Sequence, residues 1–335
     1  MLNILKKLAA IPSVSGHEHA LTAFIADYVK PYADEITFDP LGNLIVRKKA
    51  DSENAKKLMF AAHIDEIGFM VTGVTDKGFV KVTSLGGVNV AAVAYTVVQF
   101  DNGVRGVFCP DAGCGMGEWR VDKFVIDIGA KNKKEAEKKV KLGDTAIYAP
   151  GFTRLMNNRY AGHAVDDKIG AAIMMKALEN MCKTGAKFAN DTYFVFTVQE
   201  EVGCRGSKTA AFNVAPDYAV AYDVTRTGDS FGAADMEVSL GGGAAIKLRD
   251  SSVICDVEFT EFLEKLADDN KIKWQPEILV SGGTDTSSMQ MAAGGSKAGA
   301  ISIPMRYIHT GSEMFDLGDT AEIIRLTEVL LGTAL

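Results

Sequence analysis

Two adjacent glutamates, Glu200 and Glu201, come just after the apolar segment TYFVFTV. A segment this apolar predicts a strand buried on both faces, where terminal charge is costly unless a cation or a partner compensates it. Neighbouring residues that leave a strand point in different directions, so one carboxylate could hold a metal while the other transfers a proton. Alternatively, the pair lies in a solvated helix N-terminus, where acidic residues are common. The pair alone does not decide between these interpretations.

The ends of other apolar segments also carry candidate metal ligands. In open α/β sheets, ligands bind at the carboxyl ends of the strands. Imidazole combined with carboxylate suits Zn²⁺ or Co²⁺ better than Ca²⁺, and two such cations about 3.5–4 Å apart acidify a shared water. The pattern therefore predicts a dinuclear site. Its candidates are His63 after LMFAA, Asp166 and Asp167 at the start of a helix, Glu200 and Glu201, Asp223 after YAVAY, and His309 beyond GAISIP.

Each candidate also has a purely structural explanation. His63 could be a core histidine, although Asp65 and Glu66 follow it at once, and His309 could lie in a surface loop. Asp166 could be an ordinary helix N-cap, and Asp223 could be a turn residue. The metal hypothesis therefore rests on the set rather than on any single member.

The elements that position these residues fall into two kinds. Residues 1–67 and 163–335 alternate between helical and strand patterns, which predicts an α/β/α catalytic domain with a mixed sheet. Residues 68–162 are β-rich and punctuated by glycine, with a hairpin signal at residues 101–103 (DNG), which predicts an inserted small β domain of barrel or sandwich type. Near the N-terminus, Ser15 and Glu18 match a capping box for a helix that ends about Val29.

Composition excludes several classes of protein. The net charge is -7 and no basic cluster is present, so nucleic acid is not an expected partner. No segment approaches the roughly 18 apolar residues of a membrane span. The 5 cysteines are scattered and odd in number, which favours free thiols and a cytoplasmic location.

Six segments, in order, resemble the motifs of the glutamyl/deblocking aminopeptidases. These are dinuclear metallo-aminopeptidases of peptidase clan MH, and they include the tetrahedral (TET) aminopeptidases. The resemblance covers nearly the whole chain, including the β insertion. The segments are AHIDEIG (62–68), AVDDKIG (164–170), VQEEVGCRGS (198–207), AYDVT (221–225), SGGTDTS (281–287) and RYIHT (306–310).

The resemblance implies a role for each matching residue. Two divalent ions, Zn²⁺ or Co²⁺, would share Asp166, and Glu200 would act as general base on the water between them. Asp65 would orient the imidazole of His63, and the Asp166–Asp167 peptide bond would be cis. The remaining implied ligands are His63 and Asp223 for one metal, and Glu201 and His309 for the other.

Substrate contacts are less defined. Thr284 and Asp285 match a family motif, so we expect them near the substrate. A basic residue in the pocket for the N-terminal side chain would favour acidic substrates, and Arg249 is a candidate. The chain departs from the family pattern at Lys168, where arginine is frequent, and at His163, where lysine is frequent; His163 could lie just outside the metal ligands.

The sequence thus predicts an aminopeptidase that removes N-terminal residues from short peptides. The resemblance also implies homodimers, formed through the β insertion, that assemble into a tetrahedral dodecamer. One alternative is a glycoside hydrolase, because paired carboxylates also cleave glycosidic bonds and family members have been labelled endoglucanases. Another is a non-catalytic assembly protein on the same fold.

Overall fold

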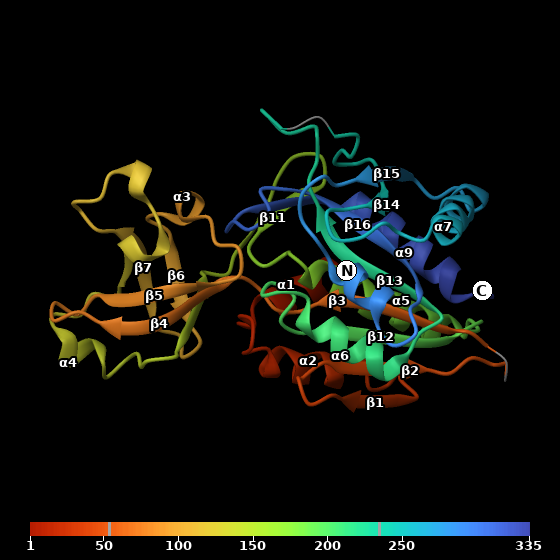
Figure 1. Ribbon diagram of the computed structural model, residues 1–335, viewed down its shortest axis with the longest axis horizontal. Coiled ribbons are helices and arrows are strands. Elements are labelled where there is room, and N and C mark those ends of the chain that lie inside the picture. The colour runs from red at the N-terminus through yellow and green to blue at the C-terminus, as the bar shows by residue number, and fades with distance from the viewer. Residues whose placement is uncertain (53–54, 234–235) are drawn as a thin grey trace.

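A computed structural model describes residues 1–52, 55–233 and 236–335. The chain forms a large α/β body and a smaller β barrel that projects from one side of it (Figure 1). This arrangement confirms the predicted fold class, an α/β/α domain with a mixed sheet and a barrel-like insertion.

The strands at the centre of the large sheet, β12, β3, β13 and β16, run parallel to one another. Their carboxyl ends therefore meet at one edge, and His63 at the end of β3 lies opposite Thr197 at the end of β12. Antiparallel strands extend the sheet on both sides. The spatial order is β1 (Glu35–Phe38), β2 (Leu44–Lys48), β12 (Asp191–Thr197), β3 (Lys57–His63), β13 (Tyr218–Thr225), β16 (Lys297–Arg306), β17 (Glu313–Asp316), β11 (Arg159–Gly162) and β10 (Phe152–Arg154), with β14 (Ala244–Arg249) and β15 (Trp274–Ile278) branching from β16.

Helices cover both faces of this sheet, and β3 shows why. Phe60 and Ala62 belong to the core beneath one set of helices, whereas Met59 and Ala61 belong to the core on the opposite face. Successive side chains of a strand point to opposite faces, so an apolar strand needs cover on both. The first set is α1 (Leu2–Ala9), α2 (His19–Val29), α5 (Lys168–Thr184), α7 (Val257–Asp269) and α9 (Leu317–Leu331), and the second is α6 (Arg205–Val214) and α8 (Asp285–Met291).

The barrel has a core of its own, in which the ring of Phe108 stacks on that of Phe124 and packs at a tilt against that of Phe69. The hairpin predicted at residues 101–103 is confirmed, because it joins β6 to β7. Closure follows the order β4 (Gly68–Val74), β5 (Val80–Leu85), β8 (Phe124–Asp127), β7 (Arg105–Pro110), β6 (Val97–Phe100) and β9 (Thr145–Tyr148), and the connections contain α3 (Val90–Val93), η1 (Met116–Glu118), η2 (Val121–Lys123) and α4 (Lys133–Ala136).

The closed barrel is shorter than the predicted insertion. It ends with β9, and the next two strands, β10 and β11, join the large sheet through β17. The predicted domain limits of 68–162 therefore enclose both the barrel and two strands of the large sheet, and as domain boundaries they stay a prediction.

The predicted capping box at the start of α2 is wrong, although the helix does end at Val29. Helix α2 begins at His19, and its N-cap residue Glu18 makes no side-chain capping bond. The Ser15 hydroxyl instead donates to Asp65 at 2.6 Å, and Glu18 accepts the backbone N–H of Gly16 at 2.8 Å. The local sequence predicts Ser15 as a helix cap, but its hydroxyl makes a long-range hydrogen bond to Asp65, near the candidate site.

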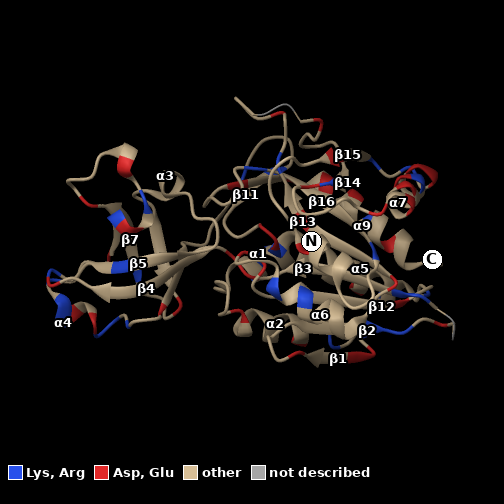
Figure 2. Cartoon of the chain, in the orientation of Figure 1, with Lys and Arg blue, Asp and Glu red and all other residues tan. Residues whose placement is uncertain are grey.

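Basic and acidic residues are interspersed along the chain in both bodies (Figure 2). Within the described ranges, no helix combines the length and the apolar character needed to cross a membrane.

Candidate metal centre

Asp166 lies between two histidines. Its Oδ1 atom is 3.2 Å from Nε2 of His63, and its Oδ2 atom is 3.3 Å from Nε2 of His309. Asp166 precedes α5, His63 ends β3, and His309 follows β16, so three separate elements bring the side chains together. The Asp166–Asp167 peptide bond is cis, which confirms the expectation drawn from the family resemblance.

The opposite nitrogen of each imidazole contacts a backbone carbonyl. His63 Nδ1 is 3.0 Å from the carbonyl oxygen of Asp65, and His309 Nδ1 is 3.2 Å from that of Gly87. A carbonyl oxygen can only accept a hydrogen bond, so each Nδ1 carries the hydrogen. In the neutral ring, Nε2 then turns a lone pair toward Asp166, and a proton or a metal cation must separate the lone pair from the carboxylate.

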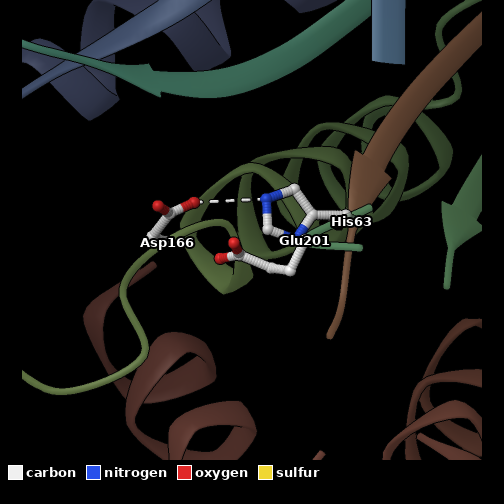
Figure 3. A group of neighbouring side chains, drawn as sticks. All are labelled: His63, Asp166 and Glu201. Atoms are coloured by element: carbon white, nitrogen blue, oxygen red, sulfur yellow. Dashed lines mark ion pairs between the residues drawn. The ribbon is translucent and has the colours of Figure 1, made fainter. Parts of the chain in front are cut away.

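Two further carboxylates complete the group. Oε1 of Glu201 is 3.3 Å from Nε2 of His309, and Oδ1 of Asp223 is 3.9 Å from Nε2 of His63. His63, Asp166 and Glu201 each present a potential ligand atom within 4.8 Å of the other two (Figure 3). The structure thus brings together all five residues predicted as ligands.

The pKa shifts of the site residues reflect the close approach of several buried carboxylates. Burial opposes ionisation of Asp166, yet the pairs with His309 and His63 hold its pKa below the ordinary range. Burial raises the pKa of Asp223 to about 8, opposed by His63 and reinforced by Asp166. Burial would lower the pKa of His309, but Asp166 and Glu201 raise it to about 11. Buried carboxylates in excess of imidazoles fit a site for divalent cations.

Glu200 lies beside this group without contacting either histidine at hydrogen-bond distance. Burial raises the pKa of Glu200 well above its usual range, with His63 opposing and Asp223 adding to the shift. Its Oε1 atom accepts a hydrogen bond from Sγ of Cys204 at 3.0 Å. Burial and the charge of Glu200 raise the pKa of the Cys204 thiol, so this thiol is a donor. A carboxylate with a raised pKa is suited to accept and return a proton.

Asp65 anchors the chain around Glu200. Its carboxylate accepts the backbone N–H of Glu200 at 2.9 Å and that of Glu201 at 3.2 Å. Its Oδ1 atom is 3.6 Å from His63 Nδ1, beyond hydrogen-bond distance. The imidazole of His63 is therefore oriented by the backbone oxygen of Asp65, and the carboxylate holds the two glutamates in place.

A cavity of about 520 Å³ opens onto the site, with His63, Asp166, Glu200, Glu201, Cys204, Asp223 and His309 in its wall. Arg226 is the one arginine or lysine among the described residues that line it. Arg249 lies elsewhere, with its Nε 3.4 Å from the carbonyl oxygen of Asp250. Thr284 and Asp285 are buried at the start of α8, behind the lining loop of residues 281–283.

Sequence reasoning did not identify Glu313, the first residue of β17. Its buried carboxylate accepts three backbone N–H groups, those of Val165 (2.7 Å), Asp166 (3.1 Å) and His309 (2.9 Å). It therefore ties together the loops that carry two of the predicted ligands. The only signal in the sequence is its position four residues after His309, which by itself indicates nothing.

Lys168 and His163, the two residues that differ from the family pattern, both contact the same buried carboxylate. Glu66 pairs with Lys168 Nζ at 2.6 Å and with His163 Nε2 at 2.5 Å. Burial would raise the pKa of Glu66, but the charges of Lys168 and His163 hold it at about 2. This buried ion pair fixes the segment after His63 against the start of α5.

Comparison with known proteins gives a consistent result. The sequence profile of the M42 glutamyl aminopeptidase family matches residues 42–326. A putative aminopeptidase from Acetivibrio thermocellus is 44% identical over 327 residues, 97% of each chain. The aminopeptidase APDkam598 from Desulfurococcus kamchatkensis superposes with a TM-score of 0.93 at 35% identity, covering 98% of this chain and 94% of its own. The TET1 peptidase of Pyrococcus horikoshii, described as able to assemble into a tetrahedron or a large octahedral shell, superposes with a TM-score of 0.88 at 31% identity over 98% of each chain.

We expect Glu313→Ala to destabilise the protein and to weaken metal binding. The substitution leaves three buried N–H groups without an acceptor, a loss of about 2–4 kcal/mol in the free energy of unfolding. Chemical denaturation measures the stability, and elemental analysis after dialysis measures the metal content. Glu137→Ala, at an exposed barrel position, is the control. Equal stability and metal content in the two variants would contradict the assigned role.

Proposed function

This chain belongs to the M42 glutamyl aminopeptidase family, and from that premise we propose that it is a metal-dependent aminopeptidase that removes N-terminal residues from short peptides. The observation that carries the proposal is Asp166 lying between His63 and His309 at 3.2 and 3.3 Å, with Glu200 beside them. The predicted ligands are proposed in the same roles.

The donor set supports two divalent cations, Zn²⁺ or Co²⁺. His63 faces one oxygen of Asp166 and His309 faces the other, and the same two imidazole nitrogens approach Asp223 and Glu201, respectively. The Oδ1 atom of Asp166 is buried and has no hydrogen-bond partner among the described residues, as expected of an atom that binds a cation. Imidazole and carboxylate ligands are those that zinc and cobalt accept. When bound, the cations polarise the scissile carbonyl and make a water molecule acidic.

Glu200 is the residue proposed to move the proton. It accepts the proton of the attacking water and returns it to the nitrogen of the leaving amine, so that the peptide bond breaks without releasing an anion. Asp65 supports this role by holding the backbone of Glu200. Burial of Asp166, His63 and Asp223 strengthens these charge interactions.

The sequence predicts Arg249 as the basic residue of the substrate pocket, but the position of Arg226 favours that residue instead. Arg226 lines the cavity, whereas Arg249 is not among its described lining residues. A guanidinium pairs with carboxylates, so Arg226 is proposed to bind an acidic N-terminal side chain. Thr284 and Asp285, buried behind the lining loop, are proposed to support the substrate pocket rather than to form its surface.

Self-association through the barrel is also proposed, with dimers building a tetrahedral dodecamer. The similar TET1 peptidase can assemble into a tetrahedron or a large octahedral shell. On the barrel, Val97 of β6 pairs in register with Val107 of β7, and their side chains are 46% and 39% exposed. Exposed apolar pairs of this kind are found at interfaces between proteins. The free cysteines support a reducing, cytoplasmic location.

Glu200→Gln should lower turnover at least about a thousandfold, because glutamine cannot accept the proton. The release of p-nitroaniline from aminoacyl-p-nitroanilides measures activity, and elemental analysis should find the metals still bound.

EDTA should abolish wild-type activity, and Zn²⁺ or Co²⁺ should restore it. Unchanged turnover in the variant defeats the assignment of the base, and a chelator-resistant activity defeats the metal-dependent reaction.

Arg226→Ala should lower kcat/KM for substrates with N-terminal glutamate or aspartate about tenfold or more, while leucine substrates change little. The loss reflects one missing charged hydrogen bond, worth about 1.5–3 kcal/mol. Arg249→Ala, assayed in parallel, decides between the two arginines. If the selective loss occurs in Arg249→Ala instead, Arg249 binds the acidic side chain, as the sequence predicts.

Val107→Glu should reduce the assembly state, because a charge cannot be buried unpaired at a contact between barrels. Light scattering after size exclusion should give the wild type a mass close to twelve times the 35.9 kDa subunit, and the variant the mass of a monomer. Ile254→Glu, at a position of the large body that is 71% exposed, should still form at least dimers. A Val107→Glu protein of unchanged mass would exclude this barrel face from the interface.

A further inference from the structure

A second group of potential ligands lies on another side of Glu200. Glu200, Cys204 and Asp285 each present an oxygen or sulfur atom within 4.8 Å of the other two. None of the three belongs to the five proposed ligands of the first centre. They come from different elements: Glu200 follows β12, Cys204 precedes α6, and Asp285 begins α8.

An independent observation at Asp285 points to a cation. This side chain is only 2% exposed. Its Oδ2 atom accepts a hydrogen bond from Thr197 Oγ1 at 2.6 Å, but its Oδ1 atom is buried without a hydrogen-bond partner in the described part of the chain. A buried carboxylate oxygen needs a donor or a cation. The nearby Ser207 hydroxyl donates to the carbonyl oxygen of Cys204 at 3.1 Å, and Glu200 and Cys204, which also lie near Asp285, are themselves candidate ligands.

We propose that Glu200, Cys204 and Asp285 form a third metal site, specific for thiophilic divalent cations such as Zn²⁺ and Cd²⁺. A thiolate with two carboxylates is a donor set for zinc and cadmium but not for magnesium or calcium. Glu200 and Cys204 both line the cavity, which gives the ion a route from solvent. On binding, the S–H bond of Cys204 is broken, a metal–sulfur bond forms, and the proton passes to the buffer.

An ion at this site occupies the carboxylate that is proposed to be the general base. Excess zinc should therefore inhibit the enzyme while the two ions of the first centre support it. This consequence rests on the proposed function of Glu200, whereas the binding of the third ion does not.

The test uses the full-length protein already loaded with two Zn²⁺ per subunit and titrated with Cd²⁺. The wild type should gain one ion per subunit by elemental analysis, together with the ultraviolet charge-transfer band of a cadmium–thiolate bond. Cys204→Ser should lose this band, and Asp285→Asn should bind the third ion at least tenfold more weakly. Cys182→Ser, which removes a thiol that contacts the carbonyl oxygen of Tyr32, should behave as the wild type.

The possible results test the third metal site and the catalytic role of Glu200 separately. A band that persists in Cys204→Ser, or a wild type that binds no third ion, overturns the site, provided that circular dichroism shows the variant to be folded. A band that depends on Cys204 without any inhibition by excess zinc supports the site and instead contradicts the role of Glu200. Inhibition by zinc in wild type but not in Cys204→Ser supports both.

Discussion

The structure depends on the meeting of buried carboxylates with two imidazoles whose Nε2 atoms face inward. Backbone carbonyls hold the Nδ1 hydrogen of His63 and of His309, so the Nε2 atom of each ring faces Asp166 and carries a lone pair when the ring is neutral. Carboxylates and lone pairs at this distance repel unless positive charge lies between them. The fold therefore gathers negative charge at one edge of the sheet, and either protons on the imidazoles or bound cations can balance it.

The sheet explains how the fold can hold these charged groups so close together. Four parallel strands end at the same edge, and the apolar cores on both faces fix their positions. Glu313 and Asp65 then secure the loops beyond the strand ends, each through backbone N–H groups rather than through the reactive side chains. The apolar core thus fixes the strand ends, and buried carboxylates fix the loops that follow them.

Much of this could be predicted from sequence because strand ends are local features. The apolar segments before His63 and Glu200 mark their strands, and parallel pairing brings those ends together. Glu313 and the Glu66 network were not predictable in this way, because their partners lie far along the chain and depend on how loops fold over the sheet. Ser15 illustrates the same limit: its spacing to Glu18 matches a local cap, yet its hydroxyl bonds to Asp65. Side chains that serve distant loops carry no periodic signal.

The contact between His309 and Gly87 means that the barrel is not a detachable module. Gly87 follows β5, and a Cβ atom there would lie 2.9 Å from His309 Nδ1. A chimaera that received its barrel from another protein would need both the glycine and the orientation of its carbonyl, or the imidazole would turn away from Asp166. A shift of the barrel relative to the catalytic body would reach the same ring through this contact. The barrel and the catalytic body therefore constrain each other at this contact.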